Sequence, residues 1–318
     1  MQLRETGAGG LEVEAVLQDG LARGDALVGG LAPVLRYLIA HDAPGLFGED
    51  ILARIRAMLA DLARQLLETL AAAEGEAIAP DDLEPALQTL GSAFLAQPAL
   101  LAHVHALALE WQLTERLQAR LALDPVVSPL LQAVIGSEDA VMASTAMAFL
   151  AAQARFGQSQ RRMELPIGEL PAEVLAAALA ALRAVVAPED DGHALAASQV
   201  IRAAHDESRG RLALAARLIA GMGPAYSAAL SVHHAGAGLF LTALAQALAI
   251  GRDAAVLVTN EAQAARLALG LRAAGIRNAG VHEQFASLYP EAALPTGFDA
   301  LGQDRAATLL ARRSGAGG

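Results

Sequence analysis

Apolar residues recur at steps of three and four between about Glu49 and Ala73, which is the spacing of one face of an α-helix. A chain built on this pattern buries its apolar side chains by packing helix against helix. Alanine and leucine, both strong helix formers, are abundant, and aromatic residues make up only 3% of the 318 residues. We therefore predict an all-α fold. The face in question carries Leu52, Ile55, Leu59, Leu62, Leu66 and Leu70.

The composition also excludes several kinds of site. The absence of cysteine excludes disulfides, thiolate zinc sites, iron–sulfur clusters and thiol nucleophiles. The sequence has no lysine either, which excludes a P-loop lysine and Schiff-base chemistry. All 23 basic residues are therefore arginine, and with 34 acidic residues the formal charge is -11. This balance argues against binding of nucleic acid. With 54% hydrophobic residues the chain is too apolar to be disordered.

Targeting and membrane signals are weak. The first residues include Glu5 and Glu12 without a compact apolar core, so we predict no signal peptide and a cytoplasmic protein. Arginine without lysine, in an alanine-rich chain, is typical of a GC-rich bacterial genome. The longest stretch without Asp, Glu or Arg is 218–251. Glycine, proline and histidine divide it into pieces shorter than the roughly 20 apolar residues that span a bilayer, so we predict buried core helices.

Breaks in the helical pattern suggest a division of the chain. We predict that residues 1–30 are poorly ordered or form a short helix, and that 31–156 form an N-terminal helical domain. The segment 157–171, with two prolines, two glycines and a basic pair, is the predicted connector. Residues 172–313 form the predicted C-terminal helical domain, and 314–318 a disordered tail.

Two segments deserve separate predictions. The helix expected over 139–156 is apolar around most of its circumference, which predicts a central position surrounded on several sides. The run Ala254–Val258 could be a strand or a helical turn, and we prefer the helix because comparable partner strands are lacking. The helix after it is expected to run from Glu261 to Ala274, with Asn260 and Gln263 as a capping box and Gly275 as its stop.

Predicted helices of about 12 to 18 residues follow one another in pairs, and each ends in glycine, proline or an acidic turn. Two such pairs are DPVVSPLLQAVIG with SEDAVMASTAMAFLAAQARF, and HAGAGLFLTALAQALAIG with RDAAVLVTNEAQAARLALGLRAAGI. Over roughly the second two-thirds of its length, the chain weakly resembles bacterial helical-repeat proteins of the HEAT or armadillo type. The resemblance implies a stacked helical scaffold with a partner-binding surface, and carries over no catalytic residue. An irregular helical bundle is the alternative architecture.

Histidine–aspartate pairs offer the main candidate chemistry. His205-Asp206 looks like the HD pair of metal-dependent phosphohydrolases, and His193 upstream with Asp253 downstream would complete the ligand set. A local cap or ion pair is the simpler interpretation of the same residues. The other pair, His41-Asp42, has no histidine before it to act as the upstream ligand.

The other histidines give weaker indications of a metal site. His103 and His105 point about 200° apart on a helix and cannot readily share a metal. Of the adjacent His233 and His234, one is expected to face the core and the other solvent.

The sequence assembles no catalytic set, so the leading hypothesis is a non-enzymatic scaffold or regulator without a cofactor, acting by binding another protein. A homo-oligomer is left open as a further partner. The first alternative is a helical metal-dependent phosphohydrolase. The second is a small-molecule sensor with its ligand in an alanine-lined cavity between helices.

Overall fold

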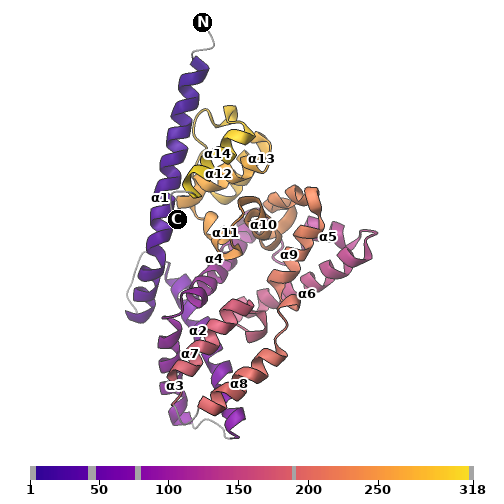
Figure 1. Cartoon of the computed structure of the whole chain (residues 1–318). Helices are drawn as coiled ribbons and strands as arrows, with labels where there is room; N and C mark the ends of the chain where they lie inside the picture. Colours follow the sequence, from indigo (N-terminus) through magenta and orange to yellow (C-terminus); the bar gives the residue numbers. More distant parts are fainter. Residues whose placement is uncertain (1–4, 42–47, 76–79, 188–190, 315–318) are drawn as a thin grey trace. The chain divides into compact units, whose positions relative to one another are not determined.

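The computed structural model describes residues 5–41, 48–75, 80–187 and 191–314 (Figure 1). These ranges contain α-helices and 3₁₀ helices and no strand, which confirms the all-α prediction. The α-helices are α1 (Glu5–His41), α2 (Glu49–Glu74), α3 (Pro80–Phe94), α4 (Pro98–Leu121), α5 (Pro129–Ile135), α6 (Ala140–Arg162), α7 (Ala172–Val185), α8 (Asp191–Ala204), α9 (Arg211–Gly221), α10 (Val232–Leu248), α11 (Arg252–Val258), α12 (Ala264–Ala273), α13 (Asn278–Leu288) and α14 (Gln303–Ser314). The 3₁₀ helices are η1 (Ile167–Glu169), η3 (Glu207–Arg209), η4 (Gly223–Leu230), η5 (Glu261–Gln263) and η6 (Phe298–Ala300).

The chain divides into two compact units, each assembled from separate stretches of sequence. The first unit comprises 1–31, 113–147 and 215–318, and the second comprises 32–112 and 148–214. The helices α1, α4, α6 and α9 each contribute residues to both. The predicted domains 31–156 and 172–313 are continuous in sequence, and the units of the structure are not.

The second unit is built around a ring of four helices. Helix α2 packs on α3 and on α8, α3 packs on α7, and α7 packs on α8 (Figure 1). The predicted apolar face of α2 lies in the core of this ring, where Ile55, Leu62 and Leu66 have no exposed surface. Burial of these faces is the main source of stability for such a bundle.

The segment 157–171, predicted as a connector, is part of the second unit. Its first residues continue α6 to Arg162, and Leu165 and Leu170 are buried in the core. The side chains of α2 hold it: the Leu165 amide donates to the Asp61 carboxylate (2.9 Å), and the Ile167 amide donates to the Gln65 side chain (3.1 Å). Satisfied backbone groups explain why a proline- and glycine-rich segment is ordered here.

The central helix of the first unit is α10. Ten of its residues are buried, and it packs against η4, α5, α11 and α12. The prediction of a central helix over 139–156 is wrong, because Val141 and Met147 of α6 are 76% and 52% exposed. Alanines lie all round α6 and make the sequence look apolar, but the single methyl group of an alanine loses little by facing water.

Helix α1 begins at Glu5 and runs to His41, so most of the segment 1–30, expected to be poorly ordered or to form a short helix, belongs to one long helix. Val13, Leu17 and Leu21 are buried along one side of it. Residues 1–4 and 315–318 lie outside the described ranges, as does Asp42 of the first histidine–aspartate pair.

The run 252–258 is helical, as preferred from the sequence. The following helix starts later than predicted: 261–263 form η5, capped by the Asn260 side chain, which accepts from the Ala262 amide at 3.0 Å. The stretch 218–251 contains a sharp bend, because Gly236 adopts a left-handed φ of 68° inside α10. Within the described ranges, no single helix is long and apolar enough to cross a membrane; two helix pairs pass only when joined across bends of 97° and 116°.

Candidate functional site

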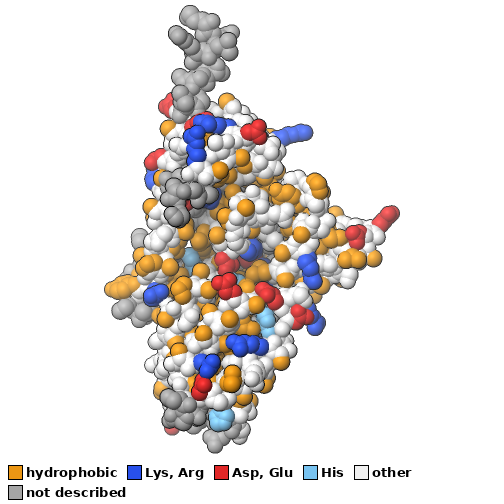
Figure 2. Space-filling model, viewed as in Figure 1, with side chains coloured by type: hydrophobic (Ala, Val, Ile, Leu, Met, Phe, Trp, Pro, Cys, Tyr) orange, Lys and Arg blue, Asp and Glu red, His pale blue; other side chains and the backbone are white. Residues whose placement is uncertain are grey.

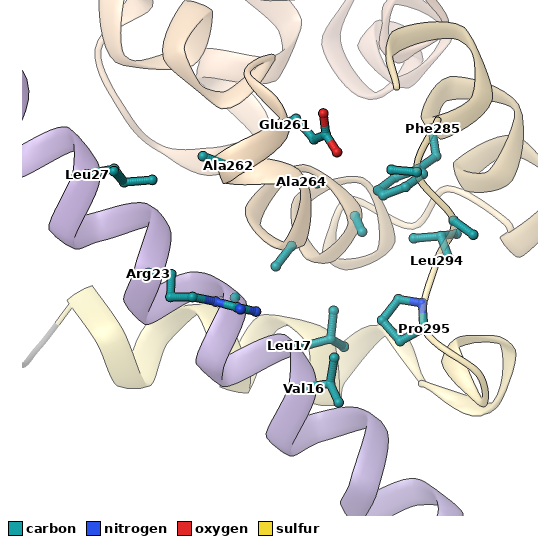
Figure 3. A pocket seen from close by; sticks show the side chains of 15 residues that line it. Val16, Leu17, Arg23, Leu27, Glu261, Ala262, Ala264, Phe285, Leu294 and Pro295 are labelled. Carbon is teal, nitrogen blue, oxygen red and sulfur yellow. The ribbon is translucent and has the colours of Figure 1, made fainter. Parts of the chain in front are cut away.

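The first unit contains an open apolar groove between α1 and the η5–α12 segment, closed on one side by α13 and the chain after it (Figure 3). We call it the α1–α12 groove. Its volume is about 540 Å³, within the usual range for ligand sites. The lining residues are Val16, Leu17, Gly20, Arg23, Leu27, Glu261, Ala262, Ala264, Ala265, Ala268, Phe285, Ala292, Ala293, Leu294 and Pro295.

Helix α1 forms one wall with a single face. Val16, Gly20, Arg23 and Leu27 follow one another at steps of four, three and four positions, which places them in one row. Val16 and Leu27 are 48% and 59% exposed, which is unusual for large apolar side chains. Leu17, beside this row, is buried and attaches the helix to the unit. The row therefore presents apolar surface to whatever enters the groove.

The opposite wall consists of alanines of η5 and α12, and it approaches α1 closely at two glycines. A Cβ atom on Gly24 would lie 2.8 Å from the Ala262 carbonyl oxygen, and one on Gly20 would lie 2.9 Å from the Ala265 Cβ. Only glycine permits this backbone separation. The short alanine side chains then leave open the space beyond the contact, which is the groove.

The third wall is formed by α13 and the chain after it. Phe285 packs edge-to-face on Tyr289 at a centroid distance of 5.0 Å, and the Tyr289 hydroxyl donates to the Val258 carbonyl at 2.7 Å. Leu294 and Pro295 continue this wall after α13 (Figure 3). The hydrogen-bonded Tyr289 ring thus supports the Phe285 ring at this side of the groove.

Ion pairs attach α1 to the rest of the first unit. The Arg305 guanidinium forms two hydrogen bonds to the Glu14 carboxylate, and Arg266 donates to Asp25. The side-chain hydrogen bond from Arg305 lowers the pKa of Glu14 below its ordinary value. Arg23 within the groove is 3.2 Å from Asp19 of its own helix, and both side chains are mostly exposed.

The chemistry available in the groove is that of binding. Its lining contains one guanidinium and one carboxylate, from Arg23 and Glu261, and no hydroxyl or imidazole group. Such a lining supplies no nucleophile with an adjacent base. It can hold apolar groups by burial and orient them with one charge of each sign.

The four candidate metal ligands of the phosphohydrolase alternative are His193, His205, Asp206 and Asp253. The His205 Nε2 atom lies 2.8 Å from the Leu170 carbonyl oxygen. The Asp206 carboxylate accepts from the Ser208 amide and hydroxyl, and this side-chain hydrogen bond lowers the pKa of Asp206. His193 is exposed in the first turn of α8, and Asp253 lies in the first turn of α11. Within the described part of the chain, no three His, Asp or Glu side chains gather as a metal site requires.

The second unit contains a buried polar network that the sequence did not suggest. The Glu110 carboxylate accepts two hydrogen bonds from the Arg211 guanidinium, and both side chains are almost completely buried. Gln153 accepts a third hydrogen bond from Arg211 at 3.3 Å, and the guanidinium lies 3.7 Å from the ring centroid of Phe156. Full pairing makes this charge tolerable in the core.

Three other histidines are buried or partly buried. His103 and His105 are both buried, and burial lowers the pKa of His105 to about 4. His233 lies with its Nε2 atom 2.8 Å from the Ser287 hydroxyl. That hydroxyl donates to the Glu283 carbonyl at 2.7 Å, so the His233 Nε2–H donates to it.

The position of the groove was not predicted, because one of its walls lies in the segment 1–30, which was expected to be poorly ordered or to form a short helix. The usable signal was the row Val16, Gly20, Arg23 and Leu27, together with Gly24 on a neighbouring face. Comparison with protein-family models, with curated proteins and with solved structures returned no match.

Proposed function

We propose that this protein has no catalytic activity of its own and acts by binding another protein at the α1–α12 groove. The observation that supports the proposal most directly is the exposed apolar row of Val16 and Leu27 beside a wall of alanines. Exposed apolar surface lining a concavity is typical of binding sites. On the face drawn in Figure 2, charged side chains are scattered among apolar ones without an extended patch of one sign, which suits apolar contact better than electrostatic capture.

An amphipathic helix is the partner element that suits such a groove. Its apolar side chains, spaced by one helical turn, would insert between α1 and α12. The shallow alanine wall accepts bulky leucine or phenylalanine side chains. Arg23 and Glu261, one charge of each sign, would pair with the polar flanks of the incoming helix. The stacked helix-pair scaffold expected from the sequence, and a cytoplasmic location, stay predictions.

Site-specific photocrosslinking in cells tests the proposal. A benzoylphenylalanine placed at Val16 or Leu27 should capture one and the same protein. The controls are benzoylphenylalanine at Val141 of α6 and at Val200 of α8, which are 76% and 61% exposed but do not line the groove. Capture of one identified protein from both groove positions and from neither control supports the proposal. The same products from all four positions, or none from the groove, would contradict it.

A small-molecule sensor is a second candidate, favoured by the six alanines in the lining. An apolar ligand of modest size would fit the same space as a partner's side chains. An apolar fluorescent probe, 1-aminoanthracene, distinguishes the two. Saturable binding to the wild-type protein, abolished by Ala264→Trp but unchanged by Val141→Trp, would support the sensor. Absence of saturable probe binding, with site-specific capture of a protein, would contradict it.

A further inference from the structure

A second cavity lies entirely within the second unit, at the carboxyl-terminal end of α6. We call it the arginine cavity. Its volume is about 480 Å³, and three arginines and two carboxylates line it. Its lining is thus net positive, in a chain whose formal charge is -11. The lining residues are Arg155, Gln158, Ser159, Arg162, Pro166, Gly168, Glu169, Ala204, Asp206 and Arg209.

The arginines reach this cavity from two sides. Arg155, Ser159 and Arg162 follow at steps of four and three on one face of α6. Arg209 belongs to η3, on the connection from α8 to α9. The turn at 166–169 forms the base, held in place by the Ile167 amide, which donates to Gln65 at 3.1 Å. Three guanidinium groups from two segments thus surround one space.

Both lining carboxylates already accept hydrogen bonds from the chain. Glu169 accepts from the Arg211 amide at 3.2 Å, and Asp206 accepts from the Ser208 amide and hydroxyl at 3.1 and 2.6 Å. The only ion pair of Arg155 within the described ranges is a long one, 3.6 Å from its Nε atom to Glu169.

The guanidinium groups of the three arginines, by contrast, make few contacts with other side chains of the chain. Arg162 lies 3.7 Å from Glu164, and its side chain is 68% exposed. Among the described residues, none of the three cavity guanidinium groups donates a hydrogen bond shorter than 3.5 Å within the chain. Each guanidinium carries five N–H donors. The guanidinium groups of the cavity therefore make few contacts within the chain, whereas both of its carboxylates accept hydrogen bonds from it.

We propose that the arginine cavity binds a small anionic molecule carrying a phosphate group or paired carboxylates. Arginine matches both groups through parallel N–H···O bonds. The volume exceeds that of phosphate alone, and Gln158, Ser159 and Gly168 offer polar contacts for the remainder of a small metabolite. This proposal is independent of the α1–α12 groove, which lies in the other unit.

Calorimetric titration of the full chain tests it, with three probes: inorganic phosphate, glucose 6-phosphate and citrate, each against chloride at matched ionic strength. The variant is Arg162→Gln, which removes an exposed charge and should leave the fold intact. The control is Arg183→Gln, in the same unit but outside the cavity, where Arg183 pairs with Asp191 at 2.9 Å.

At least one probe should bind with one-to-one stoichiometry. Arg162→Gln should weaken this binding about tenfold, as expected for loss of a charge-assisted hydrogen bond. Arg183→Gln should leave it unchanged. The phosphate and citrate titrations tell the two ligand chemistries apart. Binding of no probe, or equal affinities for the wild type and both variants, would overturn the proposal.

Discussion

The Glu110 carboxylate and the Arg211 guanidinium, which are 101 positions apart in the sequence, are joined by two parallel hydrogen bonds of 2.7 and 2.9 Å inside the second unit. Arg211 is the first residue of α9, and its amide donates to Glu169, the last residue of η1. Together with Gln153 of α6, this pair connects four elements that the chain brings together from distant positions. Such a pair specifies one arrangement of the helices, because any other arrangement leaves a charge unpaired in the core.

Removal of either partner should therefore be costly. Glu110→Gln and Arg211→Met are each expected to lower the free energy of unfolding by about 3–5 kcal/mol, because the remaining group stays buried without its partner. The double variant should lose much less than the sum of the two. Urea unfolding followed by circular dichroism measures all three values.

The exposed pair Arg183–Asp191 is the matched control for this cycle. Arg183→Gln should cost less than about 1 kcal/mol, because water screens the pair. Additive losses in the double variant of Glu110 and Arg211 would show that the two side chains do not stabilise the unit as a pair.

The close approach of α1 to η5 and α12 predicts opposite effects of one substitution at two glycines of α1. Gly24→Ala should destabilise the first unit by about 1–3 kcal/mol, because the new methyl group would overlap the Ala262 carbonyl oxygen. Gly29→Ala should raise the free energy of unfolding by about 0.5–1 kcal/mol. A Cβ atom at this position would have no atom of another segment within 4 Å, and alanine favours the helix. The midpoints of thermal unfolding of the two variants, compared with that of the wild type, measure both effects. A gain at both positions would mean that α1 does not pack here.

Burial of His105 predicts a loss of stability in mild acid. Its pKa is about 4 in the folded protein and near 6.5 when unfolded, so between these values only the unfolded chain takes up the proton. This contribution to stability is complete above pH 6.5 and falls by about 3 kcal/mol as the pH drops toward 4. Urea unfolding at pH 7.5 and 5 should show a smaller difference for His105→Phe than for the wild type. His193→Gln, an exposed control, should behave like the wild type.

Two neighbouring residues of α6 test the burial of this helix directly. Ala146 has no exposed surface, whereas Met147 is 52% exposed. Ala146→Asp should cost about 3 kcal/mol or more, because it places an unpaired charge in the core. Met147→Asp should change stability by less than about 0.5 kcal/mol. Equal melting temperatures of the two variants would contradict the orientation of α6.

The local features of the fold were predictable from sequence. The leucine face of α2 and the helix at 252–258 follow from periodicity and from the lack of partner strands. The spacing of three and four positions along α2 also accounts for the Asp61–Arg64 and Arg64–Glu68 pairs. It does not account for the second contact of Asp61, whose carboxylate accepts a hydrogen bond from the Leu165 amide. The spacing of residues along one helix predicts contacts within that helix, but it does not predict contacts with other segments of the chain.

Long-range features were not predictable in the same way. No local pattern connects Glu110 with Arg211, and a proline-rich segment resembles a linker unless the Gln65 side chain that satisfies its backbone is known. The groove depends on the close approach that Gly20 and Gly24 permit. From sequence alone, a glycine within a helix only indicates a lower helix stability. The residues that pack against these glycines, Ala262 and Ala265, are known only from the tertiary structure.

The most direct test of the account is the affinity of the crosslinked partner, once identified, for purified wild-type and variant protein. Leu27→Asp should weaken binding at least about tenfold, because it places a charge in the apolar row, and should leave the melting temperature unchanged. Val200→Asp, at an exposed valine of the second unit, should bind as the wild type does. Equal affinities of all three proteins would contradict the α1–α12 groove as the binding site.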